Sequence, residues 1–248
     1  MQEPDARLNH LLAALPASDW ARWKANLQPV DLALGQVLRE PGHEPAHAWF
    51  PTTAIVSLLY VLADGGSSEL AVIGNDGVEG LSLVMGGGSA PSRAVVQCAG
   101  RGWRVNARFI REEFLQHPAV TRLLLRYAQT VITQMAQAAV CNRHHAVEQQ
   151  LSRLLLETHD RARCDELVMT QELISTLLGV RRESVTEAAL SLQRADLIRY
   201  TRGHITVLDR PGLERRSCEC YAVVRKECDR LLPHGSRARS ADEVPVAA

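Results

Sequence analysis

The sequence lacks the features that mark a membrane or secreted protein. It has no apolar run long enough to span a bilayer, and no stretch has the pattern of a signal peptide. Its six cysteines are scattered along the chain and do not form a disulfide framework. We therefore expect a cytoplasmic protein with reduced thiols and no membrane contact.

The sequence also lacks a recognisable catalytic or metal-binding set. No serine lies in a nucleophile elbow, and no nucleophile, base and acid stand out together, so we do not expect an enzyme. Cys218, Cys220 and Cys228 match no common zinc spacing and have no histidine pair beside them. His144 and His145 are adjacent and cannot share one face of a helix. No metal site is therefore predicted.

The formal net charge is zero, which argues against a protein that coats nucleic acid without specificity. The charge is nevertheless unevenly divided. Residues 1–100 hold five Lys and Arg against ten Asp and Glu, whereas residues 101–248 hold 23 against 18. Since 248 residues are enough for two modest domains, this division fits a regulatory module joined to a DNA-binding module.

Residues 170–194 carry the pattern of two short helices joined by a tight turn. Thr170 can cap the first helix, and Gly179 can end it in the left-handed region without a Cβ penalty. The apolar positions recur at helical spacing: Leu173, Ile174, Leu177 and Leu178, then Val185, Ala188, Ala189 and Leu192. This is the pattern of a helix-turn-helix, whose second helix enters the major groove of DNA. A helical hairpin with a charged, solvated face is the structural alternative.

The start of the second helix supplies the candidate base-contacting residues. Arginine can pair bidentately with guanine, and glutamate can accept from the amino group of cytosine. The candidates are Arg182 and Glu183, followed by Arg181, Ser184 and Glu187. The candidate phosphate contacts are Thr170, Gln171, Arg202 and His204.

Two short apolar strands flank the turn Thr201-Arg202-Gly203-His204, so a winged helix-turn-helix is predicted. The stretch ELISTLLGVRRESVTEAALSLQRADLI, followed by GHITVLD, resembles the DNA-binding domain of the Crp/Fnr family of bacterial transcription regulators. The resemblance implies that Arg182 and Glu183 contact the operator half-site, with double-stranded DNA and RNA polymerase as partners. Glu187 stands where the family's cyclic-AMP-responsive activator has a second base-contacting arginine, so the operator should differ from that member's.

Residues 31–117 have short apolar runs separated by glycine- and proline-containing turns, which is typical of an antiparallel roll. This pattern resembles the cyclic-nucleotide-binding-type β-roll of Crp/Fnr proteins.

The predicted fold class is therefore α+β, with a cupin-like antiparallel roll and a winged helix-turn-helix. The predicted units are N-terminal helices in 1–30, a β-roll sensor domain in 31–117, a dimerisation helix in 118–141, the DNA-binding domain in 142–232 and a disordered tail in 233–248. Residues 159–166 are predicted as a loop, and the last helical run, after Pro211-Gly212, is predicted to pack on the winged domain.

Residues 118–141 predict one long helix with an apolar seam wider than a single packing partner needs. The seam has two adjoining stripes: Val120, Leu124, Tyr127, Val131, Gln134 and Ala138, then Leu125, Ala128, Ile132, Met135 and Ala139. In the family this helix dimerises, which implies a parallel homodimer. Its two recognition helices would lie about 34 Å apart and meet a palindromic operator. A helix buried within a monomer is the alternative.

The family resemblance also raises the question of an effector. In nucleotide-binding members a glutamate contacts the ribose and an arginine contacts the cyclic phosphate, and Glu79 and Arg93 are the nearest candidates here. The segment between them is glycine-rich and long, and the Arg-Ser/Thr-Ala signature is missing at Arg93, so we do not expect a cyclic nucleotide. The oxygen-sensing branch holds its iron–sulfur cluster largely through N-terminal cysteines, whereas the first cysteine here is Cys98. No cofactor is predicted.

A ligand-binding regulatory protein that acts through protein–protein contacts is the alternative to a DNA-binding regulator. The salt dependence of DNA binding distinguishes the two, because a protein that neutralises phosphates releases counterions.

Overall fold

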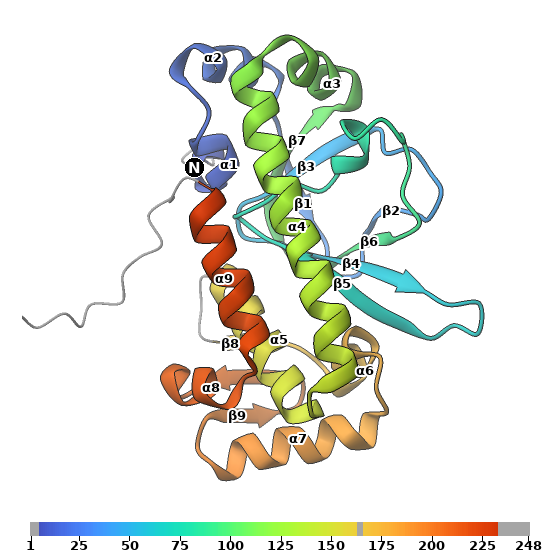
Figure 1. Cartoon of the computed structure of the whole chain (residues 1–248), viewed down its shortest axis with the longest axis vertical. Coiled ribbons are helices and arrows are strands. Elements are labelled where there is room, and N and C mark those ends of the chain that lie inside the picture. Colours follow the sequence, from blue (N-terminus) through green and yellow to red (C-terminus); the bar gives the residue numbers. More distant parts are fainter. Residues whose placement is uncertain (1–4, 163–165, 233–248) are drawn as a thin grey trace, which may run out of the picture.

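The structure is a computed structural model that describes residues 5–162 and 166–232 of the 248-residue chain. N-terminal helices cover one end of a β-rich domain, one long helix runs along its side, and a helical domain closes the other end (Figure 1). The predicted α+β class, with an antiparallel roll, a long helix and a C-terminal helix-turn-helix, is confirmed. The predicted tail in 233–248 lies outside the described residues.

The N-terminal segment contains η1 (Ala6–Leu8), α1 (His10–Ala13) and α2 (Ala17–Asn26). Asn9 joins this segment to the roll. Its Oδ1 accepts the N–H groups of Leu11 and Leu12, which caps α1, and its Nδ2 donates to the carbonyls of Pro51 and Gly77. One buried amide thus joins a helix start to two separate segments of the roll.

The roll consists of two antiparallel sheets, ordered β1-β7-β3 and β2-β6-β4-β5. Their strands are β1 (Gln28–Leu32), β2 (Val37–Arg39), β3 (His47–Pro51), β4 (Ile55–Val61), β5 (Ser67–Ile73), β6 (Arg93–Cys98) and β7 (Gly100–Asn106), with η2 (Leu81–Leu83) between β5 and β6. Phe50, Val56 and Val96 lie in the shared core. Gly100 permits the start of β7 to lie close to the backbone of residues 53 and 54, because a Cβ there would meet the Ala54 nitrogen at 2.5 Å.

The helices α3 (Ala107–Gln116) and α4 (Pro118–His144) follow the roll. Pro118 occupies the first turn of α4, where its missing N–H costs no hydrogen bond. The helix continues to His144, beyond the predicted end at residue 141. The first predicted stripe, from Val120 to Ala138, is buried against the rest of the chain. In the second stripe Leu125 and Ile132 are 54% and 58% exposed, so this stripe has no complete cover within one chain.

No helix within residues 5–162 and 166–232 combines the length and the apolar character needed to cross a membrane.

The C-terminal domain contains α5 (Val147–Arg161), β8 (Glu166–Val168), α6 (Gln171–Leu178), α7 (Arg182–Arg194), β9 (Ile198–Thr201), β10 (His204–Val207), α8 (Arg210–Arg216) and α9 (Glu219–Leu231). The wing is a three-stranded sheet, ordered β8-β10-β9. The sequence predicted two strands and a loop over 159–166, and it missed β8. A three-residue strand is too short to show a period of two, and only its pairing with β10 defines it.

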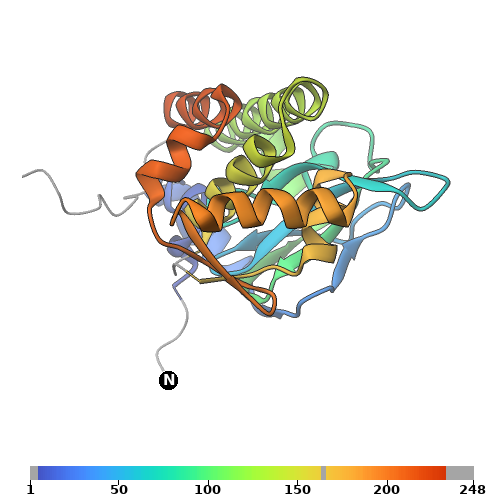
Figure 2. The same cartoon turned by 90° about the horizontal axis from the view of Figure 1, so that it is seen from below.

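The last helix, α9, lies beside α4, which corrects the prediction that it packs on the winged domain (Figures 1 and 2). Gln129 of α4 donates to Glu227 of α9 at 3.1 Å. Tyr221 of α9 reaches the core of the winged domain, and its hydroxyl donates to Asp160. The apolar stripe of α9 is therefore shared between the two partners, with α4 as the larger one.

A buried polar network joins the roll to α5. Arg161 pairs with Asp76, which follows β5, at 2.8 Å, and Arg153 pairs with Glu157 at 2.9 Å. Glu69 of β5 is buried beside them, and its Oε2 has no hydrogen-bond partner. Burial raises the pKa of Glu69 from 4.5 to about 7, and Glu157 adds to the rise, whereas Ser57, Arg153 and Arg161 oppose it.

This raised pKa predicts a pH dependence of stability. The folded state binds the Glu69 proton more tightly than the unfolded state does, so protonation of Glu69 stabilises the fold. This stabilisation is complete below pH 4.5 and is lost as the pH rises through about 7. We expect the loss to amount to roughly 3 kcal/mol of unfolding free energy. Glu69→Gln should remove this part of the pH dependence in urea unfolding between pH 4.5 and 8. The exposed-site control Glu112→Gln should retain it, and equal pH profiles for Glu69→Gln and the unmodified protein would contradict the prediction.

Candidate nucleic-acid interface

The helix-turn-helix forms as its sequence predicts. The Thr170 hydroxyl accepts the N–H of Leu173 at 3.1 Å and caps α6, and Gly179 ends α6 with φ of +66°. Val180 and Arg181 complete the turn before α7. The apolar faces of both helices are buried in one core, so the polar start of α7 is left at the surface.

The five candidate base-contacting residues lie on the first two turns of α7 or directly before them. Arg181, Arg182 and Glu183 are exposed, Ser184 is half-buried, and Glu187 is exposed one turn later. Seen from below, α7 crosses the surface of the molecule with no other element in front of it (Figure 2). The polar face of α7 is therefore accessible to a large partner.

Four candidate residues surround one surface hollow of about 370 Å³. It is lined by Thr170, Gln171, Arg182, Tyr200, Arg202 and Gly203. The Nε of Arg182 donates to the Oε1 of Gln171 at 3.3 Å, which positions the guanidinium across the turn. None of the lining residues is acidic, and two are arginines. The hollow therefore has the charge and the hydrogen-bond donors that a phosphate needs.

The wing tip is a two-residue turn in which Arg202 and Gly203 have φ of +50° and +84°. Positive φ at both positions is the type I′ pattern that matches the twist of a hairpin. Two hydrogen bonds attach the wing to the residue before the α6 cap. The Gly203 carbonyl accepts the Met169 N–H at 2.8 Å, and the Tyr200 hydroxyl donates to the Met169 carbonyl at 3.1 Å. The wing and the start of α6 thus form one surface.

Tyr200 was not among the predicted residues, although its position could have indicated it. It alternates with the exposed Arg199 and Thr201 in β9 and therefore faces the α6 side of the wing. His204 lies elsewhere: its Nδ1 is 2.6 Å from the Oε1 of Glu166 in β8. The structure therefore brings Thr170, Gln171, Arg182 and Arg202 together but not His204.

The structure separates the two candidate effector residues, so they do not form the joint pocket that the family pattern implies. Glu79 is buried, and its Oε1 accepts from Arg39 at 2.8 Å, whereas Arg93 pairs with Glu40 at the surface. A cavity of about 310 Å³ lies between the roll and α4; Arg39, Glu79, Ile132 and Met135 help to line it, but Arg93 does not. Arg39 of β2, which sequence analysis missed, is the arginine beside Glu79.

Comparison with known proteins shows a Crp-like domain and a shared fold. Residues 149–216 match the model of the Crp-like helix-turn-helix domain. A Crp/Fnr transcriptional regulator from Eubacterium rectale superimposes with a TM-score of 0.66 at 18% identity, covering 84% of this chain and 98% of that one. The chain therefore contains a Crp-like helix-turn-helix domain and has the fold of Crp/Fnr regulators. The family resemblance stated from the sequence is thereby confirmed.

Other Crp/Fnr structures have the same architecture. FixK2 from Bradyrhizobium japonicum gives a TM-score of 0.67 at 16% identity, covering 77% of this chain and 98% of that one. The c-di-GMP-responsive regulator CLP from Xanthomonas campestris gives a TM-score of 0.61 at 13% identity, covering 78% of this chain and 100% of that one. Identities this low establish the shared fold alone. Comparison with curated protein sequences finds no match. This chain thus has the fold of a Crp/Fnr-like transcription regulator with a helix-turn-helix DNA-binding domain.

Proposed function

We propose that this protein regulates transcription in the cytoplasm by binding a palindromic DNA operator as a homodimer, in contact with RNA polymerase. The observation that carries the proposal is the hollow between α6, α7 and the wing, which presents Arg182 and Arg202 beside the capped start of α6. Helix N-termini and arginine forks are the groups that hold phosphate in protein–DNA complexes. The exposed Arg181 and Glu183 lie next to this hollow, within the part of α7 that would enter the major groove.

The dimer is supported by the second stripe of α4. Leu125, Ile132 and Ala139 are exposed and seven residues apart, and Ala128 and Met135 lie between them. Positions alternating by three and four residues form the seam of a two-helix contact. A helix of 27 residues is about 40 Å long, which is enough to align two protomers side by side.

A charge on this stripe should separate the protomers. We expect Ile132→Glu to convert the dimer into a monomer in sedimentation experiments, because two buried carboxylates would face each other across the seam. Operator affinity should fall by at least about 100-fold, since one half-site then binds alone. Leu115→Glu, a similar change at an 80% exposed residue of α3, is the control and should remain dimeric. A dimeric Ile132→Glu variant would place the interface elsewhere.

The proposed function is tested by selecting DNA from a random duplex library with the purified protein. We expect one enriched palindrome whose half-site centres are about one helical turn apart. Affinity for that duplex should fall steeply with salt, with a slope of about −0.9 in log–log form per neutralised phosphate. The selection is repeated with cyclic nucleotides and with a cell extract, in case the free protein does not bind. No enrichment under any of these conditions would favour the alternative, a protein that acts through protein–protein contacts.

A further inference from the structure

Four metal-ligating side chains from two distant segments meet between α4 and α9. Cys141 lies in the last turn of α4 and His145 directly follows that helix, whereas Cys218 directly precedes α9 and Cys220 lies in its first turn. Their ligand atoms all lie within 4.8 Å of one another. We propose that these four residues form a binding site for one zinc ion per chain.

The spacing of the ligand atoms fits a single tetrahedral ion. The two sulfurs of Cys141 and Cys218 are 3.5 Å apart, and the Cys220 sulfur is 3.6 Å from the Nδ1 of His145. A zinc ion with Zn–S bonds of about 2.3 Å needs neighbouring ligands roughly 3.8 Å apart. An iron–sulfur cluster needs wider spacing, because its cysteines bind more than one iron. Three cysteines and one histidine are a common ligand set of structural zinc sites.

The burial of the cluster also indicates a metal site. Cys141, Cys218 and Cys220 are 0%, 4% and 1% exposed and form a small buried group of their own. Their neighbourhood is polar, because His145 contacts Cys220 and Arg153 acts electrostatically on Cys141. His145 lies at the edge of the group, where its side chain is still 14% exposed, and this edge provides a path for the ion.

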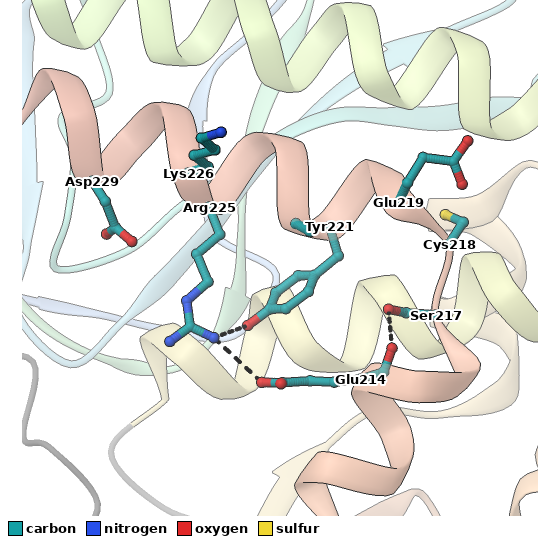
Figure 3. A pocket seen from close by; sticks show the side chains of 9 residues that line it. Glu214, Ser217, Cys218, Glu219, Tyr221, Arg225, Lys226 and Asp229 are labelled. Atoms are coloured by element: carbon teal, nitrogen blue, oxygen red, sulfur yellow. Dashed lines mark hydrogen bonds and ion pairs between the residues drawn. The ribbon is translucent and has the colours of Figure 1, made fainter.

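The surroundings would orient the ligands and balance their charge. The Nε2 of His145 lies 3.3 Å from the Oε2 of Glu219, which leaves Nδ1 facing the sulfurs. Metal-ligating histidines almost always hydrogen-bond a carboxylate or carbonyl through the second nitrogen in this way. Arg153 acts electrostatically on Cys141, and its cationic side chain would offset the single negative charge of three thiolates and a divalent ion. Cys218 and Glu219 lie at the start of α9, beside a surface hollow lined by Glu214, Tyr221 and Arg225 (Figure 3).

The site has a structural consequence. Residues 149–216 match the Crp-like helix-turn-helix model, so Cys218 and Cys220 lie beyond the matched domain and Cys141 and His145 lie before it. A bound ion would join the end of α4 to the start of α9 and would hold the DNA-binding domain in one orientation on the long helix. The sequence predicted no metal site, because neither segment by itself contains a complete ligand set.

The first test uses elemental mass spectrometry to measure the metal content of the full-length protein, which is purified under reducing conditions. We expect about one zinc per chain after extensive dialysis. Cys141→Ser and Cys218→Ser should each fall below about a tenth of this content. Cys98→Ser, at a half-buried cysteine of β6 outside the cluster, should keep one zinc and is the matched control.

The second test does not depend on how well the cysteine variants fold. The zinc-free full-length protein is titrated with Co²⁺, and we expect the strong visible absorption of a tetrahedral thiolate complex, saturating at one equivalent. Glu219→Gln should keep the spectrum and bind cobalt about 10-fold more weakly, because the ligands remain and only the orienting carboxylate is lost. Weak absorption without saturation would overturn the proposal. A metal-free reduced protein that forms a Cys141–Cys218 disulfide on oxidation would equally overturn it.

Discussion

Arg161→Met is expected to lower the free energy of unfolding by about 3–5 kcal/mol. The Arg161 side chain is 5% exposed, and its guanidinium binds both carboxylate oxygens of Asp76, at 3.2 and 2.8 Å. A third nitrogen donates to the Glu157 carbonyl at 2.8 Å. Methionine fills part of the space but leaves the Asp76 carboxylate nearly buried without its cation. An unpaired buried charge is among the most destabilising changes known in proteins.

Three further variants, Arg108→Met, Asp76→Asn and the double variant of Asp76→Asn with Arg161→Met, make this result specific. Arg108→Met removes an ion pair with Glu112 in which the side chains are 86% and 50% exposed, and it should cost less than about 1 kcal/mol. The double variant Asp76→Asn with Arg161→Met should lose less unfolding free energy than the two single variants lose in sum, because no charge is then left unpaired. Urea unfolding of the four variants and the unmodified protein measures these differences. If Arg161→Met lost as little unfolding free energy as Arg108→Met, the Arg161–Asp76 pair would contribute little to stability.

Arg182→Ala is expected to weaken binding to the selected operator by about 1–3 kcal/mol, or about 5–150-fold, and to relax specificity at one base position. Arg182 is exposed at the start of α7, and its Nε donates to Gln171 at 3.3 Å, so its guanidinium is partly oriented before DNA binds. A bidentate pair with guanine needs such an oriented fork. Binding to a panel of operators, each with one base pair changed, measures both affinity and specificity.

The pattern of loss distinguishes the two roles that Arg182 can have. Because it also lines the hollow with Thr170 and Arg202, it could contact a phosphate in place of a base. Uniform weakening over all operators, with the salt slope reduced by about one unit, would assign it to a phosphate. Arg194→Ala, at the far end of α7, is the control and should leave both affinity and specificity unchanged. Unchanged binding by Arg182→Ala would remove this residue from the interface.

Local sequence patterns were sufficient to predict the elements whose ends are marked by capping residues or whose apolar positions are periodic. Thr170, Gly179 and the apolar positions between them predicted α6, and the structure confirms its cap and its left-handed end. The two stripes of α4 were also visible in the sequence, because helical period alone assigns residues to faces. Which stripe is buried by the same chain could not be predicted, since this depends on where the roll and α9 lie.

The sequence by itself therefore determined the helix-turn-helix, the wing turn, the antiparallel roll and the long helix, since each rests on propensity, capping or periodicity within a few residues. Only the tertiary structure decided which distant side chains share a site. It paired Glu79 with Arg39 and separated it from Arg93, and it packed α9 against α4. It also brought Cys141 within 3.5 Å of Cys218, which is 77 positions later in the chain. Such contacts arise from the burial of whole faces against each other, which no local pattern of residues encodes.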